Sequence, residues 1–419
     1  MKTWSCVAGI VLAAALPAAA QEPIDAQLAA LLADAAQNNP DVQAARREAS
    51  ATRSRISPAG ALDDPMLEAG VLNYPVESRS FKTEDMTMKM IGFTQRLPYP
   101  GKRALRREVA ESEALTAEAN LQELANRVRR DVKVAYFDLG FVDESLRLAE
   151  GNRRVLEQYL ALAETRYSVG QGTQADVLKA QTQVSKMREE LIKLGRERPM
   201  LESELNRAAG RAAAPAAITP PPAKARDATF ELEELRAAAR VNRPQLAAQQ
   251  RMMDRNTRAV ALARKDYYPD FDVRVSYGQR DNSADMRRED MISFTVAINL
   301  PMWRESKRDP RVAEAESMRE QASAMYVARL NELDAMLRQQ VAAAEQSLKS
   351  VRLYETGLLP QARLTADASL AAYRVGRVDF FSLLDSRMTV FNAEVGYAAS
   401  LAAYNKALAE IEFLIGKLL

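Results

Sequence analysis

The sequence predicts a mainly α-helical protein written as two copies of one repeat, each with two β-strands and a very long helical hairpin. Three observations predict this fold class. Aromatic residues are only 6% of the 419 residues, while Ala, Leu, Glu, Gln and Arg are plentiful, as in long helices. Short sequence markers recur in the same order in both halves, and self-similarity of this kind indicates a repeat architecture. Segments of alternating apolar and polar residues precede long helical patterns.

Charge and composition exclude several classes of function. The chain carries 58 Lys and Arg against 56 Asp and Glu, so it lacks the basic character of nucleic-acid-binding proteins. Histidine is absent, and Cys6 is the only cysteine, which excludes imidazole chemistry and a cysteine metal site. No phosphate-binding loop or nucleophile elbow is present. We therefore expect no enzyme activity, no cofactor and no bound metal.

The first twenty residues have the pattern of a secretory signal peptide. Lys2 precedes the apolar run from Val7 to Leu16, and small residues end at Ala20, where we expect cleavage. A membrane anchor is the alternative, but the run is short for a bilayer. No later stretch has 18 uninterrupted apolar residues, so a membrane could be entered only by strands.

Four markers define the duplication. They are Asn38-Asn39-Pro40 with Asn242-Arg243-Pro244, Asp64-Pro65-Met66 with Tyr268-Pro269-Asp270, Leu97-Pro98 with Leu300-Pro301, and Tyr167-Ser168-Val169-Gly170 with Tyr373-Arg374-Val375-Gly376. The offsets are nearly constant. We expect a signal peptide at 1–20, a first repeat at 21–211, an extended Pro- and Ala-rich linker at 212–230 and a second repeat at 231–419.

Each repeat is expected to begin with one helix, over about 24–57 and 231–266. Strands follow where apolar residues occupy every second position, most clearly over 271–277 and 292–298 and less cleanly over 67–71 and 86–95. Polar loops, 73–85 and 278–290, separate the paired strands.

The hairpins carry the strictest pattern. Residues that are apolar except for Arg153 step by four and three from Val128 to Tyr167. A second series, apolar except for Glu355, runs from Leu337 through Leu358 to Ala362, and both are typical of a coiled-coil seam. The first limb, about 104–168, would be roughly 100 Å long. Glycines then turn the chain into return helices over about 174–209 and 379–417.

Two strands per repeat cannot close a pore. An open sheet edge in a bilayer leaves backbone groups unpaired, so only closed barrels are viable there. Two copies would leave little lumen. Three copies would supply a membrane β-barrel of twelve strands, continued by a coiled-coil tunnel of twelve helices, and we therefore expect a homotrimer.

The duplicated layout, the Tyr-x-Val-Gly turns, the Asn-x-Pro starts and the run from Leu383 to Arg387 resemble the TolC-like outer-membrane efflux factor family. The resemblance implies a trimeric channel-tunnel in outer-membrane lipid that completes tripartite pumps. Its partners would be a periplasmic adaptor and an inner-membrane efflux transporter. Segment 95–103 resembles the branch paired with heavy-metal or cation transporters, so the cargo would be metal cations or small toxic compounds.

The resemblance also implies a closed aperture at the hairpin tips. Asp176, Tyr373 and Asp385 match aperture positions of the family, with Arg377 as the neighbouring base. The sequence departs from the family pattern at Val378, where a basic residue is expected, and at Ser382, where an acid is expected. Rings of carboxylates would favour cations. The alternative is that Asp176 and Asp385 only offset helix dipoles.

The turns Val169-Gly170-Gln171 and Val375-Gly376 resemble those that meet the adaptor, although glycine also serves simple turn geometry. Met86, Met88 and Met90 share one expected strand face. Thioethers suit Cu(I), but we favour an apolar face against lipid or a neighbouring strand.

The main alternative function is a secreted or periplasmic coiled-coil structural or adaptor protein without a pore. An adaptor would show one hairpin between β-rich halves, whereas this sequence has two hairpins, each after a pair of strands.

Overall fold

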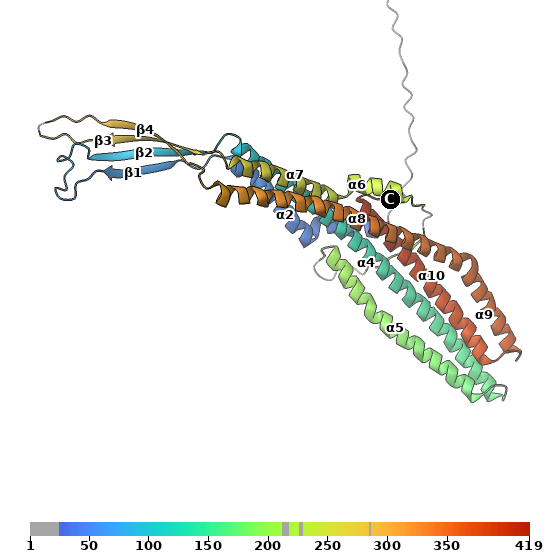
Figure 1. Ribbon diagram of the computed structural model, residues 1–419. Coiled ribbons are helices and arrows are strands. Elements are labelled where there is room, and N and C mark those ends of the chain that lie inside the picture. Colours follow the sequence, from blue (N-terminus) through green and yellow to red (C-terminus); the bar gives the residue numbers. More distant parts are fainter. Residues whose placement is uncertain (1–24, 212–217, 226–228, 285) are drawn as a thin grey trace, which may run out of the picture.

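The protein is an elongated molecule with a sheet at one end and two hairpin tips at the other (Figure 1). The computed structural model describes residues 25–211, 218–225, 229–284 and 286–419. The predicted signal peptide, residues 1–20, lies outside the described residues.

The elements follow the predicted order twice. The first set is α1 (Ala26–Asn38), α2 (Pro40–Ser54), α3 (Ile56–Gly60), β1 (Met66–Leu72), β2 (Met88–Leu97), α4 (Lys102–Ser168) and α5 (Gln174–Ala208). The second set is α6 (Leu232–Asn242), α7 (Pro244–Lys265), β3 (Phe271–Gln279), β4 (Met291–Ile298), the π-helix η1 (Arg304–Arg308), α8 (Asp309–Leu353), the π-helix η2 (Tyr354–Leu358), α9 (Leu359–Arg374) and α10 (Phe380–Ile415). With 67 residues, α4 extends over about 100 Å.

The prediction of one unbroken helix at the start of each repeat is wrong. The residue before a proline is disfavoured in the α conformation, and both Asn39 and Arg243 are extended there. The Asn39 side chain caps α2, since its Oδ1 accepts from the amides of Asp41 at 2.9 Å and Val42 at 3.2 Å. A further break at Arg55 separates α2 from α3.

The Arg243 side chain has no acceptor atom, so it cannot cap α7 in this way. A side chain of α4 supplies the acceptor instead. Glu123 Oε2 accepts from the amide of Gln245 at 3.3 Å, and Glu123 Oε1 lies 3.6 Å from Arg243 Nη2. Both charged side chains are buried. Burial lowers the pKa of Arg243, and Glu123 opposes this shift.

The return helices α5 and α10 are each followed by a glycine that packs against one of the two breaks, at Asn39 or at Arg243. Gly210 and Gly416 have φ values of +70° and +73°. A Cβ on Gly210 would lie 2.5 Å from the Asn39 amide nitrogen, and one on Gly416 would lie 2.5 Å from the Asn242 carbonyl oxygen. Both repeats are therefore closed at mid-length by the same backbone contact.

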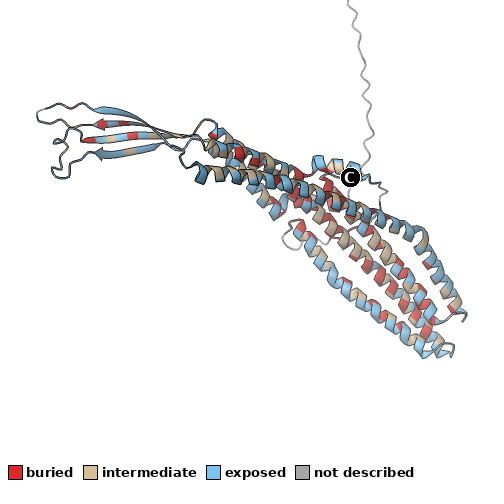
Figure 2. Cartoon of the chain, in the orientation of Figure 1, coloured by how far each residue is buried: buried red, intermediate tan, exposed pale blue. Residues whose placement is uncertain are grey.

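Three large apolar clusters fill the helical part, whose interior is buried in Figure 2. One joins both hairpins toward their tips through Leu156, Ala180 and Leu383. The other two are related by the duplication: α1 and α2 pack on α4, while α6 packs on α8 and α10 and α7 packs on α8.

The seam prediction holds along most of α4, where Val132, Leu139 and Leu156 are fully buried, but it is wrong at the last position, Tyr167, which is exposed. It is wrong at Glu355 and Leu358, which are exposed. Both lie in η2, where the wider turn rotates the helix face and interrupts the period. The seam resumes at Ala362 and Ala366, which are buried.

The four strands form one antiparallel sheet in the order β1-β2-β3-β4, and β2–β3 pairing joins the two repeats. One face carries apolar residues on every strand, and most of them are exposed. Its apolar residues are Leu67, Ala69, Val71, Ile91, Phe93, Leu97, Phe271, Val273, Val275, Tyr277, Ile292, Phe294, Val296 and Ile298, and Lys89, Gln95 and Gln279 share the face. The other face is mainly polar, with Glu68 bonded to Arg274 at 2.6 Å. Strands β1 and β4 are the open edges of this sheet.

Two of the three methionines share a strand face as expected. Met88 and Met90 lie on one face of β2, but this face is the mainly polar one, and Met86 precedes the strand. Met88 covers Gly278, where a Cβ would come within 2.5 Å of its sulfur. Met90 Sδ accepts from Arg274 Nη2 at 3.7 Å.

Part of the predicted linker, 212–217 and 226–228, lies outside the described residues. The rest has no helix or strand and is anchored to the fold. Ile218 is buried, its amide donates to Glu202 Oε1 at 3.1 Å, and its carbonyl accepts from Arg198 Nη2 at 2.9 Å.

Candidate functional site

The two hairpin tips end in the same turn. Gly170 and Gly376 have φ values of +75° and +74°, which glycine adopts at little cost. The amides of Gly170 and Gln171 donate to the carbonyls of Tyr167 at 3.1 Å and Arg166 at 2.8 Å. Gly376 and Arg377 repeat both bonds with Tyr373 at 3.0 Å and Ala372 at 2.9 Å. These paired bonds are a Schellman motif, so the turns are rigid and similar.

The return helices start with matching caps. Thr173 and Asp176 form a reciprocal capping box, with both bonds at 3.2 Å. In the second tip Asp379 Oδ1 accepts from the amide of Ser382 at 2.8 Å. Hydrogen bonds from the Ser382 side chain and amide lower the pKa of Asp379.

Arg166 connects the two tips. This half-buried side chain on α4 reaches the end of α9, where its Nη1 donates to the carbonyl of Tyr373. Its guanidinium carbon also lies 4.7 Å from the centre of the Tyr373 ring, within cation–π range. We call Arg166 and Tyr373 the tip latch.

Packing fixes Tyr373 on the second hairpin. Its ring is 4% exposed and lies 5.3 Å from that of Phe380. Burial raises the pKa of its hydroxyl, and Arg166 partly opposes the shift. The aperture tyrosine predicted from the sequence is thus a buried side chain that holds α9 against α10 and α4.

The other predicted aperture residues lie around the latch without joining it. Asp385 is exposed on the side of α10 opposite Leu384 and Ser386, which are buried. Arg377 is exposed. Asp176 is half-buried in its capping box, a placement that agrees with the helix-dipole alternative for this residue.

The predicted docking turns present apolar side chains to the outside. Val169 and Val375 are exposed at the two apices, and Gln171 is exposed beside the first. Leu178 and Phe381, near the starts of α5 and α10, are exposed as well.

Sequence reasoning missed Arg166. By the repeat offset its counterpart is Ala372, so a large cation stands in one repeat where the other has a methyl group. At a second position the charge changes sign, because Lys179 aligns with Asp385; the Nζ of Lys179 lies 5.8 Å from the Phe381 ring. Positions at which the two repeats differ in charge were the available signal.

Within the described ranges, no helix is long and apolar enough to cross a membrane. Nor does that part of the chain gather three or more Asp or Glu side chains into a potential metal site.

Comparison with known proteins gives a consistent result. A family model described as outer membrane efflux protein matches residues 31–211 and 235–417. The cobalt-zinc-cadmium resistance protein CzcC of Cupriavidus metallidurans is 24% identical over 395 residues, covering 93% of this chain and 90% of that protein. The outer membrane protein VceC of Vibrio cholerae superimposes with a TM-score of 0.78 at 18% identity, covering 94% of this chain and 97% of VceC. CusC, described with transmembrane channel formation, superimposes with a TM-score of 0.78 at 15% identity, covering 94% and 93%.

Proposed function

Because this chain belongs to the outer membrane efflux protein family, we propose that three copies close a membrane barrel and continue it as a helical tunnel into the periplasm. The protein is an outer-membrane efflux channel that conducts substrate passively, and it is not an enzyme. The fold carries the proposal: a sheet with one exposed apolar face stands on two long hairpins.

The sheet edges support three copies. One chain contributes four strands with open edges at β1 and β4, and unpaired backbone in lipid costs several kcal/mol per group. Three copies give twelve strands, with the apolar face toward lipid and the face of Glu68 and Arg274 toward the lumen. The secreted coiled-coil or adaptor alternative leaves this apolar face unexplained.

We assign partners to the two ends of the molecule. Members of the family form trimeric channels of tripartite pumps. We propose that Val169, Gly170, Gln171, Val375 and Gly376 meet a periplasmic adaptor, which in turn connects to an inner-membrane transporter. The support is the rigid Schellman geometry and the exposed apolar side chains at both apices.

We propose that the tips also form the aperture. Asp385 faces away from its own hairpin core and is free to line a central opening, where three symmetry-related carboxylates would attract cations. Arg377 and Asp176 lie near the opening, and the tip latch sets how far the hairpins can separate.

The cargo we propose is a divalent metal cation exported by the inner-membrane partner. Its support is the resemblance of segment 95–103 and the likeness to a cobalt-zinc-cadmium resistance protein along most of the chain. We further propose that the mature protein starts after Ala20 and that 21–211 and 231–419 are its two structural repeats, joined by 212–230.

Selectivity tests the aperture assignment. In planar bilayers Asp385→Ala is expected to reduce the preference for cations, seen as a reversal potential closer to zero in a salt gradient. Asp254→Ala is the matched control, because Asp254 lies on α7, outside the two hairpins, and pairs with Arg251 at 3.7 Å. An unchanged reversal potential in Asp385→Ala would remove this residue from the aperture.

A further inference from the structure

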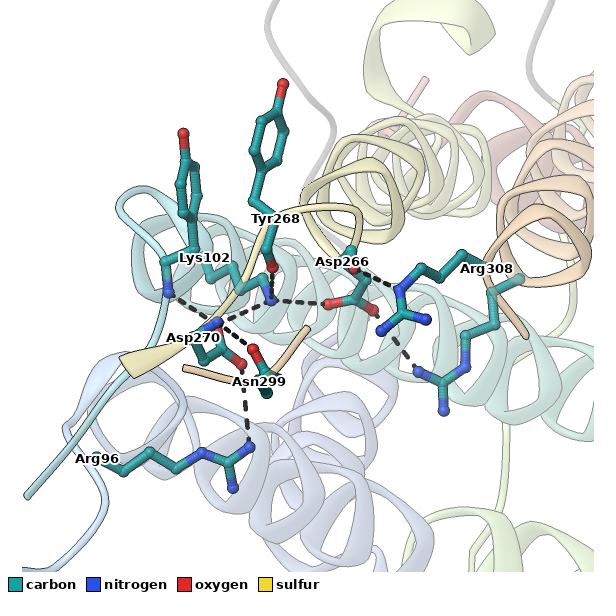
Figure 3. Close-up of polar contacts among 9 residues, drawn as sticks. Arg96, Lys102, Asp266, Tyr268, Asp270, Asn299 and Arg308 are labelled. Atoms are coloured by element: carbon teal, nitrogen blue, oxygen red, sulfur yellow. Dashed lines mark hydrogen bonds and ion pairs between the residues drawn. The ribbon is translucent and has the colours of Figure 1, made fainter. Parts of the chain in front are cut away.

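A buried ionic cluster fixes the junction between sheet and helices inside one chain (Figure 3). Lys102, at the start of α4, is 3% exposed. Its Nζ lies 2.9 Å from Asp270 Oδ1 and 3.3 Å from Asp266 Oδ1, and it donates to the Tyr268 carbonyl at 3.4 Å. The lysine belongs to the first repeat and its three acceptors to the second.

The same junction is held by backbone and aromatic contacts. The amide of Tyr99 donates to Asp270 Oδ1 at 2.8 Å, and the rings of Tyr99 and Tyr268 stack with centres 4.5 Å apart. Lys265 Nζ lies over both rings at 5.4 and 5.7 Å. We call this set, Tyr99, Lys102, Asp266, Tyr268 and Asp270, the intrachain neck.

The duplication creates a second junction of the same kind. The repeat offsets place Met302 and Glu305 where Tyr99 and Lys102 stand. They likewise place Leu62, Asp64 and Met66 where Asp266, Tyr268 and Asp270 stand. These two groups adjoin β4 and β1, the opposite edges of the sheet, so they cannot form the equivalent contact within one chain.

At this second junction the two aspartates are replaced by apolar residues that face solvent, while the exposed Glu305 stands in place of Lys102. Both aspartates that hold Lys102 become apolar, as Leu62 and Met66, which are 38% and 59% exposed. On the β4 side Met302 and Trp303 are 74% and 71% exposed. Contiguous exposed apolar side chains of this size mark an interaction surface.

We propose that the β4–α8 junction of one copy docks on the α3–β1 junction of the next, through Met302 and Trp303 on one side and Leu62 and Met66 on the other. This interchain neck rests on the trimer of the proposed function and names a contact that holds it. A second copy is the occupant because it brings together the same two pieces of backbone that meet at the intrachain neck. It also continues the edge pairing expected of β1 and β4.

The difference in chemistry has a physical reason. The partners of Lys102 are on the same chain and are present whenever it folds, so a buried charge never lacks its counter-charge. Partners on another copy are absent until assembly. A lysine and two aspartates would each lose hydration when two copies dock. Apolar residues are therefore better suited to a contact that forms only on assembly.

Cysteine cross-linking tests the contact, since no cysteine follows Cys6 in the sequence. Met302→Cys combined with Asp64→Cys occupies the positions that correspond to the stacked Tyr99 and Tyr268. Oxidation of outer membranes is expected to give covalent dimers and trimers with this pair and none with either single variant. The matched control is Tyr99→Cys with Tyr268→Cys, which is expected to cross-link at monomer mass.

Trp303 provides an independent signal, because it is the only tryptophan after residue 20. Its emission is expected to be blue-shifted in the trimer and to be little quenched by brominated lipid. Strong quenching without cross-links would mean that lipid covers this surface and would overturn the inference. A wild-type trimer without cross-links in the Cys pair would do the same, whereas a monomeric wild type would refute the proposed function itself.

Discussion

At the scale of single residues, Arg166 shows how one side chain links the two repeats. It belongs to the first hairpin, yet its guanidinium bonds the backbone and covers the ring of Tyr373 on the second. Beside the Schellman turns, this contact adds to the apolar cluster that joins the two hairpins. Because each turn is rigid, separation of the tips requires that this contact break.

We predict that Arg166→Ala favours the open aperture. Loss of a half-buried hydrogen bond and a cation–π contact weakens the latch by about 1–3 kcal/mol. Such a loss corresponds to a roughly 5- to 150-fold shift toward separated tips. Single-channel recordings should show larger or more frequent openings.

Arg188→Ala is the matched control, because Arg188 is an exposed arginine on α5 whose contact is Glu157 in the same hairpin, at 3.5 Å. Arg166→Lys keeps the charge but not the planar group and should fall between wild type and Arg166→Ala. Conductance that is identical in all these variants would show that Arg166 does not restrain the tips.

The intrachain neck makes stability depend on acid. Burial favours protonation of Asp270, but hydrogen bonds from the Tyr99 amide and Lys102 outweigh it, so the pKa of Asp270 lies below its ordinary value of about 3.9. A carboxyl group whose pKa is lowered in the folded state stabilises that state, and the full stabilisation is present at pH values above the ordinary pKa. The contribution is lost as the pH falls through the folded value.

We therefore predict that Asp270→Asn lowers the free energy of unfolding by about 2 kcal/mol at pH 6 and flattens its fall below pH 4. Urea titrations in detergent between pH 2.5 and 6 measure both quantities. Asp272→Asn, two residues along and exposed, should behave as wild type. Equal acid sensitivity in wild type and Asp270→Asn would assign the effect to other carboxylates.

Residue roles were only partly predictable from the sequence. The exposure of Asp385 and the positive φ of Gly170 and Gly376 follow from local patterns, and the structure has both. The contacts of Arg166 and Lys102 depend on groups more than 160 residues away, which no local pattern reveals. Met86 was expected on the same strand face as Met88 and Met90 because alternation in β2 is weak, and the polar character of that face is set by β1 and β3.

At the scale of elements, the ends of the return helices are more constrained than the hairpin turns. Gly170 and Gly210 have similar φ values, but a Cβ on Gly170 meets nothing within 4 Å. A Cβ on Gly210 meets the backbone at Asn38 and Asn39. A comparison of substitutions at Gly170 and Gly210 therefore separates the cost of backbone strain from the cost of disturbing close packing.

We predict that Gly170→Ala costs about 1–2 kcal/mol, the price of a left-handed alanine. Gly210→Ala should cost about 1–3 kcal/mol more, because α5 must move away from the break between α1 and α2. Thermal unfolding followed by circular dichroism compares the two. Equal losses would mean that the end of α5 yields freely and that the contact with Asn39 contributes little.

Helix limits were predicted well where the spacing of apolar residues stays regular along the sequence, and poorly where that spacing is interrupted. The limits of α4 and α5 lie within two residues of the prediction, because a long apolar seam and a glycine define them. The breaks at Asn39 and Arg243 were missed, since proline is also tolerated in the first turn of a helix. η2 was missed because Glu355 and Leu358 keep the four-three spacing in sequence while the π-turn rotates them outward.

At the scale of the whole molecule, duplication explains both what one chain completes and what it leaves open. The β2–β3 pair and the intrachain neck join the two repeats. The equivalent contacts at β1 and β4 have no partner strand within the described chain. In the proposed trimer one copy is therefore a third of a closed cylinder.

Imaging the purified channel in lipid nanodiscs by electron cryo-microscopy tests this account most directly. We predict a particle with three-fold symmetry in which β4 of each copy pairs with β1 of the next, closing twelve strands above a helical tunnel. A sheet sealed by β1 and β4 of the same copy, or three separate four-stranded sheets, would contradict it.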